Sequence, residues 1–122
     1  MKKILLGGQI FKPFKNPDEW AAHVNELGFN AVYFPLGSNA PDDEIDSYVK
    51  TAEKNNFVIA EVGAWSNPMS PDAETAKKAL QYCKDQLRLA ERVGAKCCVN
   101  ITGSCGEQWD GPSEINFSKK TF

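Results

Sequence analysis

The chain has 122 residues, of which 42% are hydrophobic and 25% are charged, a composition typical of one folded domain rather than a disordered segment. Its net charge is −2, and no basic run of five or more residues occurs, which argues against a nucleic-acid partner. No apolar stretch approaches the roughly 18 residues of a membrane span. The apolar run at residues 4–6 ends in two glycines and is too short for a signal peptide, so we expect a cytoplasmic protein without a membrane partner.

The chain repeats one unit, a short apolar strand followed by an amphipathic helix. The predicted strands are residues 4–9, 31–36, 57–63 and 97–102, and the predicted helices are residues 17–27, 42–55 and 72–93. Strands that alternate with helices at this spacing indicate βαβ units and a parallel sheet. A closed barrel needs eight such units and typically about 250 residues. The sequence therefore predicts an α/β half-barrel, the first four βα units of a TIM-barrel-type (β/α)8 fold, with residues 1–122 as one domain.

Each predicted helix carries an apolar stripe that we expect to face the sheet. The stripes are Trp20, Val24 and Leu27 on the first helix, Ile45, Tyr48, Val49 and Ala52 on the second, and Ala76, Leu80, Cys83, Leu87 and Ala90 on the third.

The four cysteines do not form a metal-binding pattern. Cys97 and Cys98 are adjacent in a predicted strand, so their side chains point to opposite faces. There is no C-x-x-C motif, and the single histidine, His23, lies on an outer helix far away in sequence. We therefore expect reduced thiols packed as small apolar residues rather than a structural zinc site.

Candidate site residues lie at the carboxyl ends of the strands, because parallel α/β sheets bind their ligands there. The apolar residues Val58, Ala60 and Val62 should face the helices, which leaves Glu61, Gly63 and Trp65 facing the barrel interior. The same alternation turns Cys98, Asn100 and Thr102 inward in the fourth strand, and Tyr33 inward in the second. A loop rich in turn-forming residues follows at residues 103–113, and such loops are often functional.

These positions assemble amides, hydroxyls and aromatic rings, which are the groups that a sugar or polyol site needs. The candidate substrate-binding residues are Gln9, Tyr33, Trp65, Asn100, Thr102, Gln108 and Trp109. Glu61 is the candidate catalytic residue, because a carboxylate inside a barrel must be paired, bound to a metal or transferring a proton. Its alternative role is a buried structural carboxylate bonded to a neighbouring strand, and Trp65 could equally plug the mouth of the barrel. We expect a carbohydrate-type small molecule as the substrate.

Residues 28–32 (GFNAV), 60–68 (AEVGAWSNP), 90–95 (AERVGA) and 100–103 (NITG) resemble the sugar phosphate isomerase/epimerase family, the xylose-isomerase-like TIM barrels. The resemblance covers the whole chain and matches the N-terminal half of that family. It implies a metal-dependent isomerase or epimerase that moves a proton between neighbouring sugar carbons. It also implies a divalent metal, Mn or Mg, held by ligands at the ends of strands 5 to 8, positions that this chain does not contain. Ala64 and Trp65 stand where many members have a histidine, which argues against a phosphodiesterase-like, trinuclear-zinc site.

Two other functions stay open. One is a lyase on the same barrel, such as C-glycoside cleavage after sugar oxidation, which also begins with proton abstraction beside a carbonyl. The other is a non-catalytic half-barrel that acts as a binding subunit. A Rossmann-like domain is disfavoured because no G-x-G-x-x-G motif follows the first strand. In each case we expect a partner, the remaining half-barrel or a second copy of the chain, to cover the open face and both sheet edges. Alone, the chain is expected to be inactive and to bind no catalytic metal tightly.

Overall fold

The computed structural model describes residues 4–121 and shows one parallel sheet in the order β1-β2-β3-β4. The strands are β1 (Gly7–Gly8), β2 (Ala31–Tyr33), β3 (Val58–Ala64) and β4 (Cys97–Asn100). Helices α1 (Pro17–Glu26), α2 (Asp42–Lys54) and α3 (Ala73–Arg92) follow the first three strands, and a 3-10 turn, η1 (Glu114–Phe117), follows the fourth. The predicted α/β half-barrel, with its strands in chain order, is confirmed.

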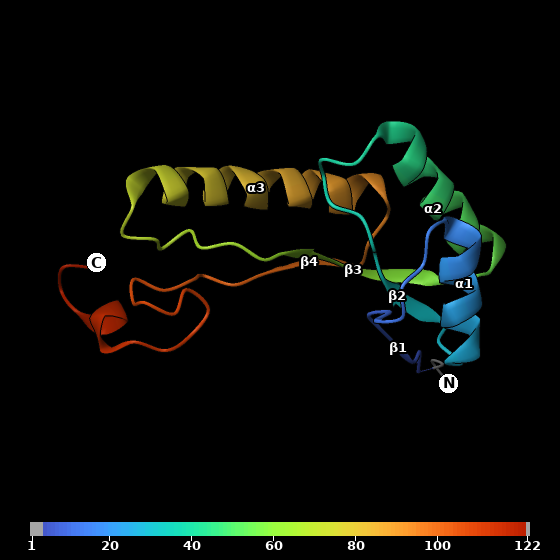
Figure 1. Cartoon of the computed structure of the whole chain (residues 1–122), viewed down its shortest axis with the longest axis horizontal. Helices are drawn as coiled ribbons and strands as arrows, with labels where there is room; N and C mark the ends of the chain where they lie inside the picture. The colour runs from blue at the N-terminus through green and yellow to red at the C-terminus, as the bar shows by residue number, and fades with distance from the viewer. Residues whose placement is uncertain (1–3, 122) are drawn as a thin grey trace.

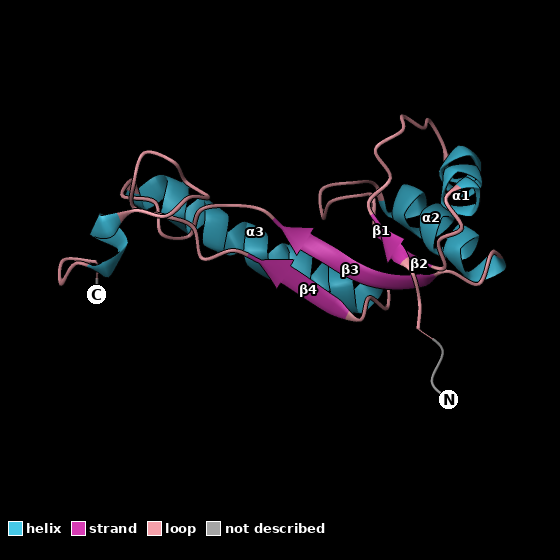
Figure 2. Ribbon diagram, turned by 90° about the horizontal axis from the view of Figure 1, so that it is seen from below, coloured by secondary structure: helices cyan, strands magenta, loops and turns pink. Residues whose placement is uncertain are grey.

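The helices form a single layer, and the opposite face of the sheet is bare. Viewed from below, β3 and β4 lie in front of α3 with no helix between them and the viewer (Figure 2). The segment after β4 runs on beyond the end of the strand and folds beneath the far end of α3 (Figure 1). No helix among residues 4–121 combines the length and the apolar character needed to cross a membrane.

The helix boundaries follow from local sequence signals. The Asn16 side chain accepts the Glu19 N–H at 2.9 Å, and Pro17 occupies the first helical position of α1. Asp72 caps α3 in the same way through the Thr75 N–H at 2.8 Å. Gly28 and Gly94, both at φ +69°, follow the ends of α1 and α3, where the chain must turn left-handed. All three helices therefore begin and end within one residue of their predicted limits.

The hydrophobic core lies between the sheet and the helix layer. Trp20 is fully buried and makes edge-on contacts with Tyr48 at 5.5 Å and Phe57 at 6.0 Å between ring centroids. Val32 and Val62 contribute the sheet side of the same cluster. This core packs α1 and α2 against the centre of the sheet, on the side opposite the bare face.

Two of the predicted helix stripes are wrong in part. Leu27 is exposed, and on α3 Leu80 and Leu87 are 51% and 61% exposed. The sheet-facing stripe of α3 consists instead of Ala79, Gln86, Leu89, Ala90 and Val93. Leu80 lies about 100° around the helix from Ala79, on the flank that faces away from α2. The sequence pattern marks both stripes as apolar and does not indicate which of them meets the sheet.

The predicted strand faces are also wrong in part, and a register shift explains the error in β3. Val32 pairs with Ile59, but Tyr33 pairs with Glu61, so β3 holds one extra residue at this point. As a result Ile59, rather than Val58 and Ala60, packs into the helix-side core. Glu61 nevertheless keeps its predicted place on the bare face, beside Tyr33.

In β4 the predicted alternation is reversed. Cys98 pairs with Val62 and Asn100 pairs with Ala64, which places both on the side that bears the helices. Cys98 indeed packs against the core, and its burial raises the pKa of the thiol. Val99, which the predicted alternation would turn toward the helices, pairs with Gly63 on the bare face. The expectation that Cys98 and Asn100 face the barrel interior is therefore wrong.

Strand β1 is shorter than predicted. It comprises Gly7–Gly8 rather than residues 4–9, and Ile4, Leu5 and Leu6 are exposed. The backbone of Leu6 still meets the next strand, because its carbonyl accepts the N–H groups of Asn30 and Ala31 at 2.9 and 3.1 Å. The side chains of Ile4, Leu5 and Leu6 therefore do not contribute to the core, and β1 is only a short edge strand.

Candidate functional site

A small hollow lies at the carboxyl ends of β2 and β3. Its volume is about 140 Å³, and it is lined by Tyr33, Phe34, Pro35, Leu36, Gly37, Gly63, Trp65, Tyr82 and Gln86. The strands supply Tyr33 and Gly63, the loops after them supply the next residues, and α3 supplies Tyr82 and Gln86. This is the edge of the sheet at which parallel α/β folds bind ligands.

The centre of the site is a hydrogen-bonded aromatic pair. The Trp65 indole N–H donates to the Tyr33 hydroxyl at 2.5 Å across the edge of the sheet. Gly63 lies beneath them, and a Cβ added there would stand 1.9 Å from Tyr33 Oη and 2.3 Å from Trp65 Nε1. A glycine is therefore required at position 63 for the pair to form. Trp65 remains 48% exposed, so part of its ring is open to a ligand.

Gln9 joins this site from the first strand. It lines an adjoining hollow of about 90 Å³ together with Ile10, Phe14, Trp20, Tyr33 and Pro35. Tyr33 and Pro35 line both hollows, so Gln9 and Trp65 belong to adjoining spaces that share these two residues. The structure thus brings together three of the predicted site residues, Gln9, Tyr33 and Trp65.

Glu61 lies on the same face as Tyr33 and is deeper in the sheet than Gly63 and Trp65. It pairs with Tyr33 on one side and Cys97 on the other, two residues before Gly63, and so about 7 Å below the rim. The side chain is partly exposed, and neither a hydrogen bond nor an ion pair joins its carboxylate to another described residue. The alternative of a structural carboxylate bonded to a neighbouring strand has no such bond to support it.

The other predicted residues do not join this group. Asn100, Thr102, Gln108 and Trp109 are all exposed. Gln108 donates to Asp110 within its own loop at 3.2 Å, and Trp109 is 40% exposed. None of these four residues lines the hollow at the Tyr33–Trp65 pair, and their role in binding stays a prediction.

A polar cluster that the sequence analysis missed holds the loop after β4 in place. Asn67 donates to the Ser104 carbonyl and accepts from the Ser104 N–H, both at 2.9 Å. Asn116 accepts the Cys105 N–H at 2.8 Å and donates to the Ser104 hydroxyl at 3.0 Å. Ser104 is fully buried. In the sequence, Asn67 lies in the turn after the third strand and Asn116 lies just after the turn-rich loop, so each resembles ordinary turn chemistry.

Gln86 is a second residue that the sequence analysis missed. It is 2% exposed on the sheet-facing side of α3, donates to the Gly63 carbonyl at 2.7 Å, and accepts the Ser38 N–H at 2.7 Å. Tyr82, one turn earlier on α3, also lines the hollow. Burial, followed by nearby Tyr33, Cys83 and Cys98, raises the pKa of Tyr82, so its hydroxyl is neutral. Both residues lie outside the apolar stripe predicted for this helix, which is why sequence reasoning missed them.

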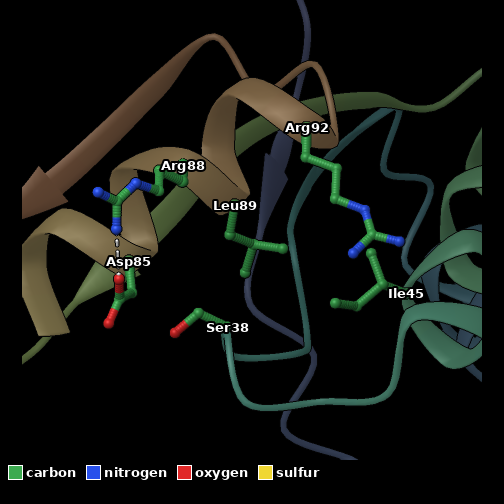
Figure 3. Close-up of a pocket in the computed structure, with 6 residues that line it drawn as sticks. All are labelled: Ser38, Ile45, Asp85, Arg88, Leu89 and Arg92. Atoms are coloured by element: carbon green, nitrogen blue, oxygen red, sulfur yellow. Dashed lines mark hydrogen bonds and ion pairs between the residues drawn. The ribbon is translucent and has the colours of Figure 1, made fainter.

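Another hollow, of about 220 Å³, lies in the helix layer between α2 and α3 (Figure 3). Arg92 reaches across it from α3 and forms ion pairs with Asp42 and with Asp46, the latter at 2.9 Å. Arg88 is paired with Asp85 at 2.8 Å on the same helix, as the dashed line shows (Figure 3). Arg88 and Arg92 are each ion-paired with an aspartate. The hollow therefore lies among contacts between protein side chains and offers neither arginine as a free group to a ligand.

The described residues do not fit the divalent metal that the family resemblance implies. Among residues 4–121 there is no group of three or more His, Cys, Asp or Glu side chains placed to hold a metal ion. Glu61 presents a carboxylate beside Tyr33 on the bare face. A Mn or Mg ion therefore needs ligands from outside the described part of the chain.

A protein-family model described as a xylose isomerase-like TIM barrel matches residues 21–116. The matched span runs from α1 to η1 and includes Tyr33, Glu61, Trp65 and Gln86, whereas Gln9 precedes it. No curated protein and no solved structure matches the chain.

Proposed function

This chain belongs to the xylose isomerase-like TIM-barrel family, and we propose that it forms the N-terminal half of a sugar or sugar phosphate isomerase or epimerase. The family includes sugar isomerases and epimerases as well as other enzymes. The observation that best supports a sugar substrate is the Tyr33–Trp65 pair at the carboxyl edge of the sheet, with Gln9 beside it. Its substrate is a carbohydrate-type small molecule.

The three side chains suit a hydroxylated ligand. The exposed part of the Trp65 ring offers an apolar face on which the C–H groups of a sugar can stack. Because Tyr33 accepts the Trp65 N–H, its own O–H is free to donate to a substrate hydroxyl. The Gln9 amide can both donate and accept. Together these groups bind and orient the sugar without carrying charge.

Isomerisation and epimerisation move a proton beside a carbonyl, and such a step needs an acid and a base within hydrogen-bond reach. We assign Glu61 to this role, because its carboxylate lies on the same face as Tyr33 and has no described partner. The second acid–base group, and the ligands of a Mn or Mg ion, would come from the remaining half-barrel or a second copy of the chain.

The test uses the protein in its natural form, with any polypeptide that accompanies it. The protein is incubated in D2O with Mn²⁺ and a panel of free and phosphorylated aldoses and ketoses, and NMR follows deuterium uptake at the carbon beside the carbonyl. We expect uptake with at least one sugar, and a loss of affinity of roughly tenfold in Trp65→Ala. Phe117→Ala, which removes another exposed aromatic ring from η1, outside the candidate binding residues, serves as the control.

Three outcomes separate the possible functions. Sugar binding without deuterium uptake would favour the non-catalytic binding subunit. Uptake accompanied by bond cleavage would favour the lyase. No binding of any sugar, or equal affinity in Trp65→Ala and the wild type, would refute the proposal.

A further inference from the structure

We propose that Gln86 is a positioning residue that sets the spacing between the carboxyl end of β3 and the loop after β2, and thereby the shape of the hollow around Tyr33 and Trp65. The role in sugar binding rests on the proposed function. The effect on the aromatic pair itself does not, since it can be measured without any ligand.

The two groups that Gln86 binds lie on either side of the hollow. Its Nε2 donates to the carbonyl of Gly63, the residue beneath the Tyr33–Trp65 pair, and its Oε1 accepts from the N–H of Ser38 in the loop after β2. One amide thus connects α3, β3 and that loop.

Gln86 bonds these groups where the sheet no longer does. The Phe34 N–H donates to the Glu61 carbonyl at 2.9 Å, but no described backbone N–H of the loop after it donates to the Gly63 carbonyl, two residues further along β3. The Gly63 carbonyl lies beyond this hydrogen bond, where β2 has already left the sheet. Gln86 supplies the missing donor, and the register of Gly63 against the loop therefore depends on a side chain.

The burial of this amide also points to positioning. Its neighbours on the sheet-facing side of α3 are Ala79, Leu89, Ala90 and Val93, all apolar. A buried amide costs free energy unless it is hydrogen-bonded, and an apolar residue of the same length could fill the space without that requirement. Fully bonded polar groups in a core contribute a defined geometry. Here the geometry that they define is that of the candidate site.

A larger groove, about 650 Å³ in volume, shares a lining residue with the hollow. Ser38 and Tyr82 line this groove together with Asn39, Lys78, Gln81 and Asp85. Tyr82 also lines the inner hollow, so the groove and the hollow meet at its ring. Moving the Ser38 loop away from α3 would therefore change both spaces.

The test compares Gln86→Met, which keeps the length but removes both hydrogen bonds, with Lys84→Met on the exposed side of the same helix. For the spectra both are made in Trp109→Phe, where Trp65 is the remaining exposed indole, and sugar affinity is measured with Trp109 in place. The readouts are the native-state emission of Trp65, the quenching of that emission by acrylamide, and the affinity of the protein for a probe sugar, D-fructose or D-xylose. Gln86→Glu is a second variant, since it keeps the acceptor for Ser38 and loses the donor for Gly63.

We expect Gln86→Met to fold, to change the acrylamide quenching constant of Trp65 about twofold, and to weaken sugar binding about fivefold or more, while Lys84→Met matches its parent. Gln86→Glu should alter the Trp65 spectrum even if Gln86→Met does not fold. Unchanged Trp65 emission and quenching in a folded Gln86 variant that only melts earlier would show a purely structural role and overturn the inference. If the protein with Gln86 and Trp109 both in place binds neither sugar, the proposed function fails, and the Trp65 spectra still decide the role of Gln86.

Discussion

Gly63 is the residue on which the geometry of the candidate site most directly depends. An added methyl group would stand 1.9 Å from Tyr33 Oη and 2.3 Å from Trp65 Nε1, closer than non-bonded atoms can approach. We predict that Gly63→Ala breaks the Tyr33–Trp65 hydrogen bond and lowers the free energy of unfolding by about 1–3 kcal/mol, as overpacking does in cores. Urea unfolding gives the stability change, and Trp65 emission reports the hydrogen bond.

Gly8→Ala is the matched control, because Gly8 also lies in a strand. A Cβ at Gly8 would meet its nearest neighbour, Phe29, at 3.6 Å, which is ordinary contact. We expect the free energy of unfolding of this variant to stay within about 0.5 kcal/mol of the wild type. Equal losses in the two variants would mean that the backbone of glycine, and not the space above Gly63, matters at this position.

At the scale of single elements, the cap of α3 makes the helix sensitive to acid. Hydrogen bonds from the Thr75 side chain and backbone lower the pKa of Asp72 below its ordinary value of 3.8. A lowered pKa in the folded state means that the cap stabilises the helix fully above pH 3.8, and that this contribution disappears as the pH falls through the lowered pKa. We predict that circular dichroism between pH 5 and 2 shows an acid-dependent loss of helix that is smaller in Asp72→Asn, since asparagine caps without a charge. An identical pH profile in both proteins would contradict this role.

The elements were predictable from the sequence because their signals are local. Asn16, Asp72, Gly28 and Gly94 mark helix ends within a few residues of chain, and the alternation of strands with helices indicates the parallel sheet. The faces of the elements were less predictable. The extra residue in β3 reverses the alternation midway, and a bulge leaves no mark in a strand whose residues are apolar apart from Glu61.

The part of the candidate site that is formed by residues at the strand ends was predictable from the sequence. Gln9, Tyr33 and Trp65 come together because each ends a strand or directly follows one. Gln86 was not predictable in this way, because its hydrogen bonds join groups far apart in sequence, at positions 38 and 63. A single glutamine in a charged helix has the same local signature whether it faces solvent or the sheet.

At the scale of the whole molecule, the chain exposes more surface than a compact protein of its mass. Its accessible surface is 8421 Å², whereas a compact monomer of 13.5 kDa would expose about 6,500 Å². The surplus of roughly 1,900 Å² exceeds what one partner contributes to a standard interface, about 800 Å². It includes apolar side chains at the sheet edge and on the free flank of α3, such as Leu5, Leu80 and Leu87.

This surplus leads to a prediction about the isolated chain. Unpaired strand edges and exposed apolar surfaces promote association, and in the described structure β1 and β4 each have one side without a neighbouring strand. We predict that the purified 122-residue chain sediments as a dimer or larger species, or binds an apolar dye, until the remaining half-barrel or a second copy covers the bare face. Replacing Leu80 and Leu87 together by lysine should weaken this association without lowering the melting temperature, because both side chains are already exposed. A monomer with a cooperative melt and no dye binding would show that the half-barrel is stable alone, and that its open face needs no partner.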